Sequence, residues 1–267
     1  MGYRSIISLM PKTAPVDADA EAFLTAAGIT DPTISGAINT LVVQMKADNI
    51  WTKMKAIYPM VGGSASTHKW NLKDPRDLDA AFRLVFSGGW THSANGALPN
   101  GTNGYADTFY NPSINGLLNS AHLSYYSRTQ IVSNQIDFGG YHSTSNCGNY
   151  LSYSYTGSFY NSINDDNAIF GSGLATTTGF LIGSRPNSTT SKHYHNNSIV
   201  KSQTKNSVIN PNFKLFLGCG NWVGAPLLFS TKQCAFASIG DGLTDTEAAN
   251  FYTAVQAFQT TLNRQIV

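Results

Sequence analysis

Apolar and polar positions alternate with a period of two through the middle of the chain, in short runs separated by Gly, Asn and Pro. Such alternation is typical of strands that bury one face, and such punctuation is typical of turns. The sequence therefore predicts a mainly β fold, an antiparallel β-sandwich across about 56–240. The strands that we expect are Phe82–Phe86, Leu123–Arg128, Ile136–Phe138, Leu151–Tyr155, Phe159–Asn164, Phe180–Ser184, Ser198–Lys201, Phe213–Leu217 and Cys234–Ser238.

Helical periodicity precedes this region. Asp17–Ala27 carries apolar residues at i, i+3, i+4 and i+7, and Gly28 follows it as a C-terminal stop. Asp31 is an N-cap candidate, and Pro32 suits the first helical position. A second helix is therefore expected from residue 32, with an apolar stripe formed by Ile34, Ile38, Leu41, Val42 and Met45.

A third helix is predicted at the other end of the chain. Thr244 and Glu247 have the spacing of a capping box. The apolar residues after them share one helical face, namely Phe251, Val255, Phe258 and Leu262. We therefore expect an N-terminal attachment segment over 1–16, a helical lead-in over 17–55, and a β-sandwich with its C-terminal helix over 56–267.

Charge is scarce, which narrows the classes of function. Charged residues make up 12% of the chain and the net charge is +2, against a usual charged share of about 25%. Such a chain has no basic field for a phosphate backbone, so we expect no nucleic-acid partner. No apolar run approaches the ~18 residues of a membrane span, and Ile6–Met10 is also too short for a signal-peptide core. We expect no membrane insertion.

Cysteine and histidine offer little metal chemistry. Cys147, Cys219 and Cys234 are an odd number without metal-ligand spacing, so we expect buried free thiols. The last two should lie at one end of a sheet, on neighbouring antiparallel strands. His193 and His195 would project from one side of a strand, but no third ligand is visible. A polar strand edge is favoured over a metal site, and no cofactor is expected.

Carboxylates do not form an evident catalytic pair. A glycosidase generally needs two carboxyl groups facing across the sugar, but the only glutamates, Glu21 and Glu247, have helix roles. The adjacent Asp165 and Asp166 are expected in a solvated acidic turn, with a calcium-binding loop as the alternative. Asp107 and Asp137 are expected to be isolated. The sequence thus predicts no enzyme and no catalytic residue.

Aromatic residues lie among Asn, Ser and Gly, a combination that suits sugar rings. We take Tyr141, Tyr150 and Trp222 as candidate ligand-binding residues, and 141–167 as the candidate contact region. On the strand at Leu151–Tyr155, alternation predicts that Tyr150 faces outward, whereas Tyr153 and Tyr155 share the side of Leu151. The alternative is that most of the aromatic residues belong to the core or an interface, a set that also includes Trp90, Tyr105, Tyr110 and Tyr160.

Four stretches carry a family resemblance. They are Lys73–Asp79 (KDPRDLD), Phe86–Thr108 (FSGGWTHSANGALPNGTNGYADT), Leu123–Arg128 (LSYYSR) and Cys234–Gln265. In the last stretch, a strand that ends at Ile239 is followed by Gly-Asp-Gly-Leu-Thr-Asp-Thr-Glu at the start of the predicted helix. Together they resemble bacteriophage virion proteins, tail-fibre or surface components with a concanavalin A-like (laminin-G-like) module. The segment before Tyr58 resembles the helical lead-in of that module, so the resemblance covers about 17–267.

The resemblance implies a concanavalin A-like jelly roll in a protein of the virion, assembled in the host cytoplasm. Other virion proteins, further copies of the chain and a host surface glycan are the implied partners. The family has no shared catalytic motif, and the Glu-x-Asp-x-x-Glu strand of lectin-fold glucanases is missing here. We therefore expect a non-enzymatic fibre, spike or decoration subunit. The alternative is a carbohydrate-binding module of a bacterial surface or secreted protein, and a glycan-cleaving depolymerase lacks its carboxylate pair.

Overall fold

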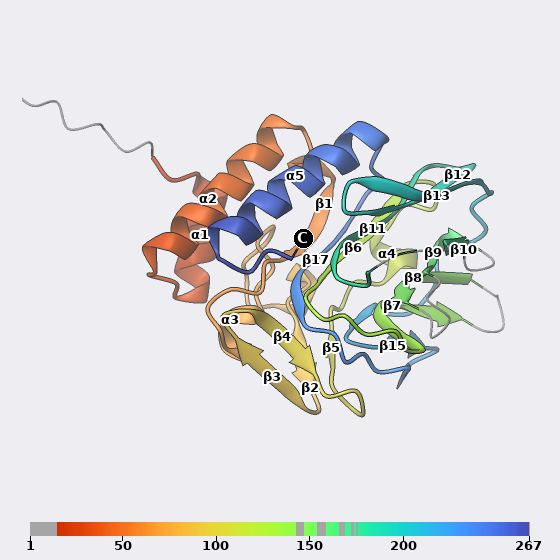
Figure 1. Cartoon of the computed structure of the whole chain (residues 1–267), viewed down its shortest axis with the longest axis horizontal. Coiled ribbons are helices and arrows are strands. Elements are labelled where there is room, and N and C mark those ends of the chain that lie inside the picture. The colour runs from red at the N-terminus through yellow and green to blue at the C-terminus, as the bar shows by residue number, and fades with distance from the viewer. Residues whose placement is uncertain are drawn as a thin grey trace, which may run out of the picture.

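The computed structural model describes residues 15–142, 147–153, 159–165, 169–171, 174 and 176–266. Two sheets of largely antiparallel strands pack face to face, and helices from both ends of the sequence cover the outer face of one sheet (Figure 1). The prediction of a mainly β sandwich with helices at both ends is confirmed. The jelly-roll connectivity stays a prediction.

The first sheet lies between the helices and the second sheet. Its strands pair in the order β13-β12-β11-β6-β17-β4-β3, and β1 also pairs with β17. Their bounds are β1 Met54–Tyr58, β3 Trp90–Ser93, β4 Gly96–Pro99, β6 Ala121–Ser127, β11 Gly179–Asn187, β12 Thr190–His195, β13 Ser198–Thr204 and β17 Cys234–Gly240.

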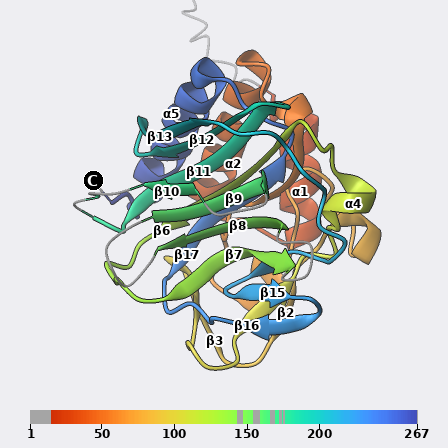
Figure 2. The same cartoon turned by 90° about the vertical axis from the view of Figure 1, so that its right-hand side faces the viewer.

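The second sheet pairs in the order β10-β9-β8-β7-β14-β5-β2, with a hairpin of two further strands, β15 and β16, beside β7 (Figure 2). Their bounds are β2 Val85–Ser87, β5 Tyr105–Asp107, β7 Gln135–His142, β8 Cys147–Tyr153, β9 Phe159–Asp165, β10 Ile169–Gly171, β14 Phe216–Leu217, β15 Gly220–Trp222 and β16 Ala225–Leu227.

The helices begin where the capping signals place them. Asp17 accepts the Asp19 amide in front of α1, and Asp31 accepts two amides in front of α2. Thr244 and Glu247 form the reciprocal capping box of α5. The helical segments are α1 Ala18–Ala27, α2 Pro32–Ala47, η1 Trp51–Lys53, α3 Ala65–His68, η2 Asp79–Ala81, α4 Pro112–Asn115 and α5 Asp245–Thr261.

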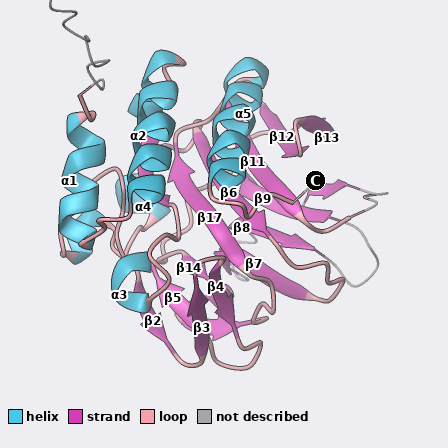
Figure 3. Ribbon diagram, turned by 60° about the vertical axis from the view of Figure 1, so that its left-hand side comes forward, coloured by secondary structure: helices cyan, strands magenta, loops and turns pink. Residues whose placement is uncertain are grey.

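Two apolar layers hold the fold together. Helices α1, α2 and α5 lie over the first sheet (Figure 3). Tyr126, Phe180 and Phe236 of that sheet pack in one apolar cluster with the buried faces of these helices. Its opposite face meets the second sheet in a core that includes Leu123, Tyr125, Phe138, Leu151, Ile163 and Ile239. Strand alternation explains why the neighbours Tyr125 and Tyr126 belong to different layers.

Two predicted strands are wrong in extent. Phe82 has a left-handed backbone with φ 58° and closes the short helix η2, so the strand there begins only at Val85. Phe213 and Leu215 are buried in the core without belonging to a strand, and β14 keeps only Phe216 and Leu217 of the predicted run. Burial of these apolar residues is correct, but apolar alternation alone does not fix the backbone.

The aspartates expected to be isolated or solvated are paired with cations. Asp137 accepts from Lys232 Nζ at 2.9 Å, and both side chains are buried. Asp165 is a buried member of β9 that accepts from the guanidinium of Arg185, so the prediction of a solvated acidic turn is wrong for it. Asp107 pairs with Lys214 at 3.0 Å. Asp166 lies outside the described residues.

The cysteine and histidine predictions need correction as well. All three cysteines are buried and free, as expected. Cys219 follows β14 of the second sheet whereas Cys234 opens β17 of the first, so they do not lie on neighbouring strands. His193 and His195 are buried in β12, which is flanked by two strands, so the polar strand edge is wrong.

The helices of the described ranges include none long and apolar enough to cross a membrane.

Candidate functional site

The three aromatic residues proposed from the sequence meet on the second sheet. Ring centroids of Tyr141 and Trp222 lie 4.7 Å apart at an interplanar angle of 55°, and those of Tyr141 and Tyr150 lie 6.2 Å apart, edge to face. All three side chains are half-buried. We call these three residues the aromatic cluster. Both contacts fall within the centroid distances at which aromatic pairs attract one another.

Strand alternation places the cluster on the outer face of the sheet. Leu151 points into the core between the two sheets, so its neighbour Tyr150 points away from that core. Tyr141 contacts Tyr150 from the adjacent strand β7 and therefore shares its side. Figure 2 looks onto this region, where β7 and β8 run side by side and the β15–β16 hairpin lies beyond β7. The expectation that Tyr150 faces outward agrees with this arrangement.

Trp222 reaches the cluster because β15 runs parallel to β7, with Trp222 opposite Tyr141 and Asn221 opposite Gly140. A Cβ on Gly140 would lie 2.4 Å from the Phe213 ring and 2.8 Å from the Asn221 carbonyl oxygen. Only glycine therefore permits this close approach of the backbones.

Asn221 fixes the hairpin that carries Trp222. Its side chain is buried, with Nδ2 donating to the Lys214 carbonyl at 2.8 Å and Oδ1 accepting from the Gly224 amide at 2.6 Å. The turn at Val223 and Gly224 has positive φ at both positions, a backbone that suits a two-residue hairpin. Asn221 thus acts as a positioning residue for Trp222.

A second glycine shapes the floor beneath Tyr150. A Cβ on Gly148 would lie 2.7 Å from Cε1 of the Tyr150 ring. The missing side chain lets the ring lie back along its own strand toward Tyr141. Burial among its neighbours, with Tyr141 and Tyr160 nearby, raises the pKa of Tyr150 above the ordinary value, so its hydroxyl stays protonated.

Two exposed apolar side chains lie on the hairpin that carries Trp222. Val223 is 52% exposed at the hairpin tip and Leu227 is 45% exposed on β16. The Trp222 indole N–H has no hydrogen-bond acceptor within the part of the chain that the structure describes, whereas that of Trp90 donates to the carbonyls of Ser87 and Tyr105. Trp222 therefore offers both a ring face and a spare donor.

The other aromatic candidates have mainly structural surroundings. Tyr110 is buried against Phe82, and Tyr105 packs against Phe216 with centroids 4.9 Å apart. Tyr160 is half-buried near Tyr150. Of the contact region predicted over 141–167, residues 143–146, 154–158 and 166–167 lie outside the described residues, Tyr155 included, as does the side chain of Tyr153.

Metal chemistry has no visible centre in the described ranges, and the carboxylates there have structural partners or are exposed. No group of three or more His, Cys, Asp or Glu side chains there is arranged to hold a metal ion. Glu247 is held by Lys53 at 2.5 Å and by its capping box, and Glu21 is exposed on α1. The buried Asp137 and Asp165 are neutralised by their cations.

No family model and no curated protein matches the sequence of this chain. Solved structures share its fold. A mutant Trypanosoma rangeli sialidase displaying trans-sialidase activity is 11% identical and matches with a TM-score of 0.53 over 83% of this chain and 39% of its own. A Streptococcus pneumoniae NanB sialidase is 17% identical, with a TM-score of 0.43 over 62% of this chain and 27% of its own.

A shorter structure is also similar, the Ruminococcus gnavus IT-sialidase CBM40. It is 13% identical and matches with a TM-score of 0.35 over 48% of this chain and 79% of its own. The chain spans between 23% and 39% of the length of seven sialidase chains that it resembles. At these identities the likeness concerns the fold alone.

Proposed function

We propose that this chain is a non-enzymatic carbohydrate-binding module that contacts sugar through Tyr141, Tyr150 and Trp222. The observation that carries the proposal is the convergence of these residues, from β7, β8 and β15, into one half-exposed cluster. Ring faces pack against the C–H faces of a sugar, and the Trp222 N–H supplies a donor beside them.

A single cluster of this kind binds weakly. Three rings tilted against one another offer a sugar only a small contact area. Useful adhesion therefore needs several copies, since linking weak sites raises avidity by about 10²–10⁴. An oligomer of this chain, or an assembly that displays many copies, is the form in which we expect function.

The chemistry of the described residues supports binding rather than catalysis. Neither glutamate faces a second carboxylate across an open site, and the buried aspartates are paired with Lys232 and Arg185. A tyrosine nucleophile would need an activated hydroxyl. Burial instead raises the pKa values of Tyr58, Tyr110, Tyr125, Tyr150 and Tyr194.

A second candidate function is that of a structural subunit exposed on a bacteriophage particle. The four stretches that resemble virion proteins support it, and such a location would supply the multiple copies that weak binding requires. Mass spectrometry of purified particles tests this candidate. Detection of the chain as a stoichiometric particle component would support it, and absence from particles produced by a host that expresses the chain would refute it.

Glycan binding itself is tested with a biotinylated chain assembled on tetravalent streptavidin and applied to a broad glycan array. We expect reproducible binding to a related group of glycans by the tetramer, with a much weaker signal for the monomer. A tetramer that binds no glycan on the array would refute the carbohydrate-binding proposal.

A further inference from the structure

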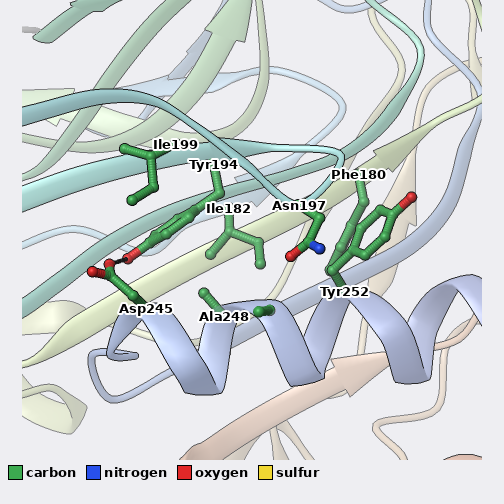
Figure 4. A pocket seen from close by; sticks show the side chains of 9 residues that line it. Phe180, Ile182, Tyr194, Asn197, Ile199, Asp245, Ala248 and Tyr252 are labelled. Carbon is green, nitrogen blue, oxygen red and sulfur yellow. Dashed lines mark hydrogen bonds between the residues drawn. The ribbon is translucent and has the colours of Figure 1, made fainter.

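A pocket of about 160 Å³ opens between the first sheet and the C-terminal helix, away from the aromatic cluster. Its walls come from β11, from β12 and β13 with the turn between them, and from the first turns of α5 (Figure 4). The lining residues are Phe180, Ile182, Tyr194, Asn197, Ile199, Asp245, Ala248, Ala249 and Tyr252. Nothing in the proposed function uses this pocket.

The pocket combines an apolar floor with polar ends. Ile182 and Ala248 lie at its middle, Asp245 and Tyr194 lie at one end, and Asn197 and Tyr252 lie toward the other (Figure 4). Ile199 is 49% exposed at its edge. An occupant with an apolar face and a hydrogen-bonding rim matches this distribution.

The carboxylate of Asp245 is ionised and already accepts hydrogen bonds from two side chains. Lys192 donates to both its oxygens at 2.7 and 2.8 Å, and the Tyr194 hydroxyl donates to one of them at 2.7 Å. The hydrogen bond from Lys192 has the largest effect and that from Tyr194 the next largest, and both lower the pKa of Asp245. An ionised carboxylate has about four acceptor sites, so Asp245 can accept a further hydroxyl from a ligand.

Size restricts the occupant to one ring. A protein cavity of about 150 Å³ lined by apolar side chains accommodates a benzene molecule, so the present volume suits a single six-membered ring. The rim favours hydroxyl groups on that ring, because Asp245 accepts, and the Asn197 amide and the Tyr252 hydroxyl both donate and accept.

The charges of Asp245 and Lys192 favour an uncharged ring over an acidic or a cationic one. An acidic sugar would bring its carboxylate toward Asp245, which lines the pocket while Lys192 does not. A cationic ligand would gain little from Asp245, because the ammonium group of Lys192 already neutralises that carboxylate and would repel a second positive charge. We propose that the pocket binds one uncharged pyranose ring, with its C–H face on Ile182 and Ala248 and its hydroxyls on Asp245, Asn197 and Tyr252.

This site goes beyond the proposed function and shares no residue with the aromatic cluster. It is tested by ¹⁵N NMR titration of the full chain with the methyl pyranosides of glucose, galactose, mannose and N-acetylglucosamine. The acidic probes are methyl glucuronide and the methyl glycoside of N-acetylneuraminic acid. We expect at least one uncharged pyranoside to shift the amides of Asn197, Ala248 and Ala249 saturably, and the acidic sugars to shift them less.

Two pocket variants and one distant variant make the result specific. Ala249→Leu fills the pocket from a half-buried helix position with a good helix former. Asn197→Gly removes the amide while tolerating the left-handed backbone, φ 67°, at that position. Both should abolish or weaken the shifts, whereas Trp222→Ala should leave them intact and affect only binding at the aromatic cluster.

The proposal is overturned if no uncharged pyranoside shifts these amides, if the shifts survive Ala249→Leu, or if an acidic sugar binds the pocket more tightly than every uncharged one. Loss of array binding in Trp222→Ala with intact pocket shifts would separate the two sites. Pocket shifts without any array binding would refute the proposed function and leave the pocket standing.

Discussion

Trp222 and Tyr141 lie opposite each other on parallel strands, with their ring centroids 4.7 Å apart. The pairing of β15 with β7 is parallel, whereas the other strand pairs of both sheets in the described ranges are antiparallel. The geometry of the candidate site thus depends on this parallel pairing in the second sheet. Substitution of the residues that hold β15 beside β7 should therefore change the contact between Trp222 and Tyr141.

Asn221→Ala should release the hairpin that carries Trp222. The substitution removes a buried amide that bridges the Lys214 carbonyl and the Gly224 amide, and an unsatisfied buried partner costs about 1–3 kcal/mol of the free energy of unfolding. We expect weaker glycan binding together with a changed ¹⁹F spectrum of fluorotryptophan at position 222. The exposed Asn95→Ala is the matched control, and equal behaviour of the two variants would contradict the positioning role.

Gly140→Ala should disturb the same contact from the other strand. The added methyl group would overlap the Phe213 ring and the Asn221 carbonyl, so β15 must move away from β7. Overpacking of this kind typically costs about 1–3 kcal/mol. The expected result is a lower melting temperature with loss of the Tyr141–Trp222 contact, measured by nuclear Overhauser effects between the two rings.

Gly224→Ala serves as the comparison for that variant. A Cβ at this position meets no atom within 4 Å, but the backbone φ of 96° is unfavourable for alanine. It should destabilise the turn but keep the Trp222 backbone beside Tyr141. If Gly140→Ala preserves the ring contact, the close approach of the strands is not what positions Trp222.

Phe258→Ala should destabilise the whole fold. Phe258 is buried on α5, packs against Phe236 of the first sheet and lies under the Arg264 guanidinium. Removal of a buried phenylalanine side chain costs about 3–5 kcal/mol. Urea denaturation of this variant beside the exposed Thr253→Ala checks the value, and an unchanged midpoint for Phe258→Ala would mean that α5 is peripheral to the core.

Acid should weaken the fold through three buried histidines. Burial lowers the pKa of His68 and His193 to about 3 and that of His122 to about 4. In the unfolded chain these groups titrate near 6.5. Below pH 6.5 the unfolded chain therefore binds protons that the folded chain does not, and each histidine removes about 1.4 kcal/mol of the free energy of unfolding per pH unit.

Urea midpoints at pH 7.5, 6.5, 5.5 and 4.5 measure this dependence. We expect little change between the first two values and a steady decline below them. His193→Phe should show a shallower decline, because phenylalanine has no group that titrates. The ring should fit the site, since neither ring nitrogen of His193 has a hydrogen-bond partner among the described residues and the site already contacts Phe159. A midpoint that stays constant down to pH 4.5 would contradict the assignment of neutral buried histidines.

Local signals in the sequence predict local structure well. The caps at Asp31 and Thr244, the apolar faces of α2 and α5, and most strands follow from periodicity and capping chemistry. These features depend on residues a few positions apart, so the sequence of one segment is enough to predict its helix or strand. The outward side of Tyr150 follows in the same way from its neighbour Leu151.

Long-range pairing is what the sequence does not reveal. The cations that neutralise Asp137 and Asp165 come from distant segments, Lys232 and Arg185. Arg264 donates to the carbonyls of Pro59, Met60 and Ala235 from a buried position that periodicity does not mark. The pocket at Tyr194 and Asp245 likewise joins two elements whose contact no local pattern specifies.

The most direct test of sugar recognition by the aromatic cluster compares two tryptophan variants on the glycan that the tetrameric chain binds best. Trp222→Ala removes a ring of the cluster, and Trp70→Ala removes another half-buried tryptophan, which packs against the helix-side core and Lys69. We predict that Trp222→Ala weakens monomer affinity, measured by titration calorimetry, about tenfold, as expected for the loss of one stacked aromatic contact, and that Trp70→Ala leaves it unchanged. Equal affinity of wild type and Trp222→Ala would contradict binding at this site.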